Sequence, residues 1–176
     1  MQPIVHPVVG YLCYAVYARF ATGEAPREAP VLAALVGATV PDLIDKPLVA
    51  VGVVDVGRTI GHSLLGAVPI VLAVWLVATR VDRRELGIAF AIGYASHLAA
   101  DVPWHVLAGD YDELGFLLWP ITHMPEYTGV KTLGTIGSVT VTTLWLEAVI
   151  FVVGVTLWWR DGRPGLGVIR RILRES

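Results

Sequence analysis

The chain has 176 residues, enough for one domain, of which 55% are hydrophobic and 16% charged, and its mean hydropathy is +0.66. This composition lies outside the range of soluble domains, so it indicates a membrane protein and argues against a nucleic-acid binder. The single cysteine, Cys13, excludes a disulfide framework and multi-cysteine metal sites, and the formal net charge of -2 matters less than where the charges lie along the chain.

Several apolar segments approach the length that crosses a bilayer. We expect helices at about residues 4–20, 31–54, 60–79, 86–108 and 138–159, because a helix satisfies its own backbone hydrogen bonds in lipid. The second should be broken at residues 41–47, where two prolines and three charges oppose a continuous helix, and the fourth should kink or end near Pro103. The predicted fold is therefore all-α: an integral membrane helical bundle of about five spans with a broken second span.

The segments outside these spans predict the topology. The connection at residues 109–137 mixes acidic and aromatic residues, which is typical of an interfacial loop or of a lid over a site. Residues 160–176 alternate arginines with apolar residues and predict a basic amphipathic helix on anionic membrane lipid, so we divide the chain into a membrane-embedded domain, residues 1–159, and a basic cytoplasmic tail, residues 160–176. Of the 13 lysines and arginines, ten fall on the side of this tail, which predicts a protein of the cell (inner) membrane with its C-terminus in the cytoplasm and its N-terminus outside.

Alternating helix directions bring polar residues from four spans to the same outer half of the bundle. These residues are His6, Asp42, Asp45, His62, His97 and Asp101. His97 and Asp101 are four apart and share a helix face, so both can bind one metal ion, or Asp101 can hold the His97 ring in place. Imidazole and carboxylate groups suit zinc, manganese or iron. Because each intramembrane charge costs about 2.5–3.5 kcal/mol, their convergence predicts a metal or catalytic site; the structural alternative is helix packing and capping.

Four further polar residues lie outside this predicted cluster. Arg58, close in sequence to His62, is a candidate for holding a substrate phosphate. Glu147 is either a partner of a ligand or an ion pair with Arg58. His105 and His123 are expected to be solvated or interfacial histidines in or near the outer loop.

Three motifs in this order carry a resemblance to a known family. They read PDLID at residues 41–45, GRTIGHSLL at 57–65 and GYASHLAAD at 93–101, and GFLLWP follows at 115–120. From His6 to about Pro120 the chain resembles the YdjM-type family of membrane-bound metal-dependent hydrolases. The resemblance implies a hydrolase whose metal ligands map to His6, Asp42, His62, His97 and Asp101. The order of these residues also resembles, more weakly, that of zinc-dependent phospholipases C and related nucleases.

The chain departs from the family pattern at the first of these motifs, PDLID. One residue is inserted between its aspartates and Lys46 stands where the family has a histidine, so either Asp42 or Asp45 can be the ligand. We expect hydrolysis of a phosphoester of a lipid or envelope component, with zinc as the divalent metal and manganese as the alternative, and with Asp45 and Arg58 as catalytic residues. A different class of function stays open, in which the same residues form a non-catalytic ion or proton relay.

Overall fold

The computed structural model describes residues 2–102, 111–122, 132–136, 139–142 and 144–175. Most of these residues form helices: α1 (Val5–Thr22), α2 (Glu28–Gly37), α3 (Val40–Ala50), α4 (Leu64–Arg80), α5 (Arg84–Ala100), α6 (Leu144–Arg160) and α7 (Leu166–Glu175). A 3-10 helix, η2 (Asp112–Leu118), and an antiparallel hairpin of β1 (Thr132–Ile136) and β2 (Val139–Thr142) lie between α5 and α6 in sequence. The helical bundle is confirmed.

The hairpin was not predicted, because residues from 138 onward were assigned to the last span. Here α6 begins only at Leu144. The four residues of β2 read VTVT, and such β-branched residues favour the extended backbone of a strand over a helix.

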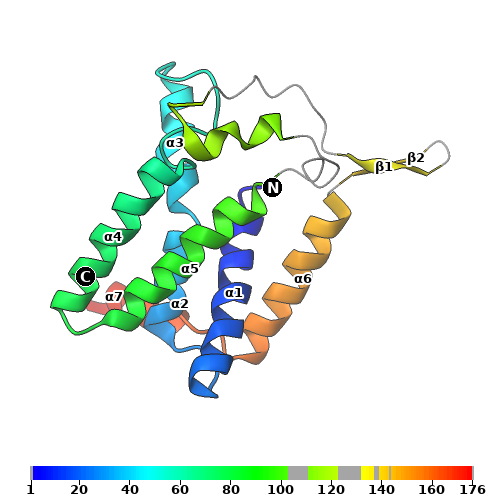
Figure 1. Ribbon diagram of the computed structural model, residues 1–176. Helices are drawn as coiled ribbons and strands as arrows, with labels where there is room; N and C mark the ends of the chain where they lie inside the picture. Colours follow the sequence, from blue (N-terminus) through cyan, green and yellow to red (C-terminus); the bar gives the residue numbers. More distant parts are fainter. Residues whose placement is uncertain (1, 103–110, 123–131, 137–138, 143, 176) are drawn as a thin grey trace.

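Helix α5 lies at the centre of the bundle and packs against α1, α2 and α4, while α1 also packs against α2 and α6 (Figure 1). Small residues allow the α2–α5 contact. A Cβ atom at Gly37 would collide with the carbonyl oxygen of Phe90, and one at Gly93 would collide with that of Ala34. The N-terminus and α3 lie at one end of the bundle and α7 at the other (Figure 1).

The break in the second predicted span is confirmed, but its position differs. Helix α2 ends at Gly37 and α3 starts at Val40, so the chain breaks at residues 38–39 and residues 41–47 are helical. Pro41 stands in the first turn of α3, where no helical partner for its missing N–H is needed. The break leaves the carbonyl of Ala38 available for a side chain.

Two other boundaries differ from the prediction. Helix α4 begins at Leu64 rather than residue 60 because the Ser63 hydroxyl caps it, accepting a hydrogen bond from the Leu65 N–H at 3.1 Å. Helix α5 ends at Ala100, ahead of Pro103. Within the described residues, no helix combines the length and the apolar character that crossing a membrane requires, so the five spans stay a prediction.

Candidate metal centre

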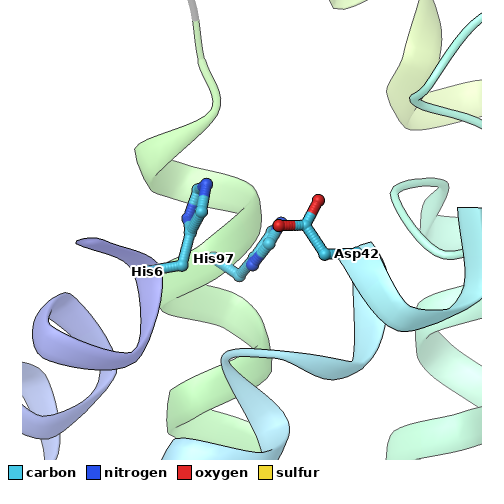
Figure 2. Close-up of side chains that lie close together, drawn as sticks. All are labelled: His6, Asp42 and His97. Atoms are coloured by element: carbon cyan, nitrogen blue, oxygen red, sulfur yellow. The ribbon is translucent and has the colours of Figure 1, made fainter. Parts of the chain in front are cut away.

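The residues predicted to converge do lie together, at the end of the bundle that carries the N-terminus. They come from the first turn of α1, from α3, from the loop before α4 and from the end of α5: His6, Asp42, Asp45, His62, His97 and Asp101. Arg58, predicted separately as a candidate for holding phosphate, lies beside Asp101. The three histidines, Asp45 and Asp101 are at most 4% exposed. Figure 2 shows His6, Asp42 and His97 meeting from three different helices.

Two imidazole rings face each other at the centre of this cluster. His97 Nδ1 lies 2.7 Å from the carbonyl oxygen of Ala38, and His62 Nδ1 lies 2.7 Å from Asp45 Oδ2. Both partners only accept hydrogen bonds, so each Nδ1 carries the hydrogen and each neutral ring presents a lone pair at Nε2. The two Nε2 atoms are 3.0 Å apart. Two lone pairs at this distance repel each other, and only a cation between them, a proton or a metal ion, makes the contact attractive.

Carboxylates surround the two nitrogens. Asp101 Oδ2 is 3.3 Å from His62 Nε2 and 3.9 Å from His97 Nε2, and Asp42 Oδ1 is 3.9 Å from His62 Nε2. Among the described residues, two sets offer one ligand atom per residue with all atoms within 4.8 Å of one another: His62, His97 and Asp101, and His6, Asp42 and His97. Because His97 belongs to both sets and its Nδ1 is engaged, its Nε2 atom is the position that the two sets share.

His6 closes the cluster on the side of α1. Its ring stacks on that of His97 with centroids 3.7 Å apart, and its Nε2 lies 3.5 Å from Asp101 Oδ1. Its Nδ1 is buried and has no hydrogen-bond partner among the described residues. A buried imidazole nitrogen without a protein partner is costly, which fits a ring that serves as a ligand.

The structure places Asp45 behind His62 rather than among the facing ligand atoms. Its carboxylate accepts hydrogen bonds from Thr59 N at 2.7 Å, Thr59 Oγ1 at 2.9 Å, Gly61 N at 2.9 Å and His62 N at 3.2 Å, in addition to His62 Nδ1. Asp42, by contrast, belongs to one of the two sets. Of the two aspartates that the sequence left open, Asp42 therefore has the position of a ligand and Asp45 that of a residue that orients one.

Arg58 and η2 cover the cluster. The Arg58 side chain bonds Asp101 Oδ2 through Nε at 3.2 Å, and its guanidinium carbon lies 5.4 Å from the centre of the buried Phe116 ring. Ser63 Oγ donates to the Trp119 carbonyl at 2.6 Å, which ties η2 to the start of α4. The part of the predicted outer loop that contains η2 thus lies over the site. Phe116 was not predicted as a site residue, although Phe116 lies in the GFLLWP motif.

The motifs that supply these residues stand in a recognisable order, and a family model described as YdjM inner membrane protein matches residues 1–168. The chain belongs to the YdjM inner membrane protein family. Comparison with curated proteins and with solved structures gives no match. The family resemblance inferred from the motifs is confirmed, and the description of the YdjM family agrees with the predicted inner-membrane location.

The remaining predicted residues of this YdjM-family protein lie elsewhere. Glu147, buried on α6, accepts a hydrogen bond from the backbone N–H of Gln2 at 2.8 Å and so ties α6 to the start of the chain near His6. Lys46, the departure from the family pattern, pairs with Asp42 at 2.7 Å on the surface of α3. His105 and His123 lie outside the described residues.

Proposed function

We propose that this YdjM-family protein is a membrane-bound metal-dependent hydrolase that acts on a phosphoester of a lipid or envelope component. The observation that carries the proposal is the buried pair of nitrogens, His62 Nε2 and His97 Nε2, which face each other at 3.0 Å while both Nδ1 atoms donate elsewhere. Zinc–nitrogen bonds of about 2.0–2.1 Å bring two histidine nitrogens on one ion to a separation of roughly 3–3.5 Å. The residues therefore fit a divalent metal with little movement.

The ligands would be His62, His97 and Asp101, with Asp42 and His6 as further donors around the same position. A mixed set of imidazoles and carboxylates fits zinc, with manganese as the alternative. Asp45 would act as a positioning residue, because a carboxylate that accepts the Nδ1 hydrogen fixes the ring and strengthens Nε2 as a donor to metal. In this arrangement Asp45 does not touch the substrate.

A divalent metal bound there would lower the pKa of water towards neutrality and polarise a phosphoryl oxygen. Arg58 supports the phosphoester as substrate: its guanidinium is planar, permanently charged and held beside the ligands by Asp101 and Phe116. Phe116 and the rest of η2 cover the cluster, which strengthens the electrostatic interactions beneath them.

A proton relay is the second candidate, and the continuous contact of ionisable groups favours it. The His6 ring stacks on His97, His97 meets His62 at 3.0 Å, and His62 meets Asp45 at 2.7 Å. A proton shared between the two Nε2 atoms would also relieve their repulsion. The relay requires no metal, and this separates it from hydrolysis.

The test uses purified full-length protein in lipid, stripped of metal with a chelator and assayed with phosphodiester and phosphomonoester substrates before and after addition of zinc or manganese. We expect turnover only with metal, abolished by His97→Ala and kept by Ser96→Ala, since Ser96 is a neighbour that bonds only Gly93 O among the described contacts. Metal-independent turnover, or full turnover in His97→Ala, would refute the hydrolase. Tight metal binding without hydrolysis of any such substrate would also count against it, and proton flux without metal would favour the relay.

A further inference from the structure

An apolar groove lies between α1, α2, α6 and α7, and none of the residues that line it belongs to the histidine cluster. It has a volume of about 170 Å³ and its walls include Val8, Leu32, Leu35, Val155, Trp158 and Ile169. An apolar cavity of about 150 Å³ in another protein holds a benzene ring, so this groove has room for on the order of six carbons of an aliphatic chain.

Helix α7 is fixed where it forms one wall of the groove. Its first turn is tied to α2 because Glu28 Oε2 accepts a hydrogen bond from Val168 N at 3.0 Å. The preceding turn is tied to α6 because Trp158 Nε1 donates to the Pro164 carbonyl at 3.0 Å. The groove is thus bounded by residues with defined partners, and the tail predicted as a separate basic segment packs on the bundle.

The two faces of α7 differ in chemistry. Leu166 and Ile169 line the groove, and Leu173, two turns after Leu166 on the same face, is 71% exposed. Arg170 and Arg174 follow Leu166 by four and eight residues and so stand along one edge of this apolar face, and both are exposed. An apolar wall bordered by guanidinium groups matches a molecule with an aliphatic chain and a negatively charged head.

We infer that this groove binds part of one acyl chain of an anionic phospholipid, whose phosphate head is held by Arg170 and Arg174. The inner-membrane family supplies the environment in which such lipids occur. Arginine pairs with phosphate oxygens through two parallel hydrogen bonds. A zwitterionic head has no net charge and therefore attracts the arginines less than an anionic head does. The inference is independent of the proposed hydrolysis, because the groove and the histidine cluster share no lining residue.

The experiment reconstitutes the full chain in phosphatidylcholine vesicles that contain a matched fraction of either phosphatidylglycerol or phosphatidylcholine with brominated acyl chains. Bromine quenches nearby tryptophan, and the contribution of Trp158 among the six tryptophans is isolated with Trp158→Phe. We expect the brominated anionic lipid to quench tryptophan fluorescence more than brominated phosphatidylcholine does. Trp158→Phe should remove this excess quenching. The Arg170→Gln/Arg174→Gln variant should also lose it.

The matched control is Arg80→Gln/Arg84→Gln, which removes the same charge from exposed arginines on either side of the turn between α4 and α5. This control should keep the excess quenching. Equal quenching by the two brominated lipids, an excess that persists in Trp158→Phe, or its loss in both arginine variants alike would overturn the inference. Ile169→Asn serves as a second test, since a polar wall should lower the excess with all arginines in place.

Discussion

Asp45→Asn distinguishes a residue that orients a ligand from a ligand. The substitution keeps the shape of the side chain and replaces one acceptor oxygen by an NH₂ donor. The amide keeps the most hydrogen bonds when its oxygen takes the Oδ2 position, because it can then accept from Thr59 N, His62 N and His62 Nδ1. At the Oδ1 position the Thr59 hydroxyl can rotate to accept, and the Gly61 N–H loses its acceptor.

Two effects of known typical size are expected, one on stability and one on metal affinity. One buried N–H left without an acceptor lowers the free energy of unfolding by about 1–3 kcal/mol. Loss of the carboxylate behind a metal-binding histidine weakens metal affinity by about 10–100-fold, which corresponds to about 1.4–2.7 kcal/mol. Asp45→Asn should therefore still bind metal, more weakly than the wild type.

Competition with a chromophoric chelator measures the metal affinity, and chemical unfolding followed by helical signal measures the stability. The control is Asp161→Asn, a buried carboxylate at the other end of the bundle that accepts hydrogen bonds from Tyr11 and from Arg19. It should lose stability without a change in metal affinity. Wild-type affinity in Asp45→Asn would show that the carboxylate does not support His62, and complete loss of metal in a folded variant would show that Asp45 is itself a ligand.

Substitutions at Gly61 and Arg58 test the site, and cysteine labelling tests the topology. Gly61→Ala should cost about 1–3 kcal/mol of stability and weaken metal binding, because the new Cβ would lie 2.6 Å from the Pro41 carbonyl oxygen; unchanged unfolding and affinity would contradict this. Arg58→Ala should raise KM for an anionic substrate while metal content stays near the wild-type value; an unchanged KM would remove the phosphate role. Cysteines placed at Asp112 and Ser176 should be labelled from outside intact cells at the former position only, and labelling at 176 would reverse the topology.

The convergence of the polar cluster could be predicted from the sequence because helix direction alternates. His6 and His62 stand near the start of apolar segments, and His97 and Asp101 stand near the end of another, so up-and-down helices place them at one end without knowledge of the packing. Which nitrogen of each His ring carries the hydrogen could not be predicted this way. It depends on Asp45 and on the carbonyl of Ala38, and a backbone carbonyl leaves no signature in the sequence.

The position of the helix break depends on a local preference of proline. Prolines and charges at residues 41–47 signalled a break, but proline is tolerated in the first turn of a helix, so the interruption falls just before it, at residues 38–39. The strand after η2 differs from the predicted helix because the β-branched residues at 139–142 favour extended backbone although the segment is apolar. Both features are local ones: a proline suited to the first turn of a helix and a run of β-branched residues suited to a strand.

The metal content of purified protein shows whether the facing nitrogens of His62 and His97 hold a divalent metal. Elemental analysis of the full chain in lipid, after exposure to zinc and removal of loosely bound ions, should find stoichiometric metal in the wild type and in Ser96→Ala. His97→Ala should contain none, because His97 belongs to both sets of candidate ligands, and it should retain its helical signal. Wild-type protein without metal after zinc loading, or equal metal in His97→Ala, would contradict a metal site at these two nitrogens.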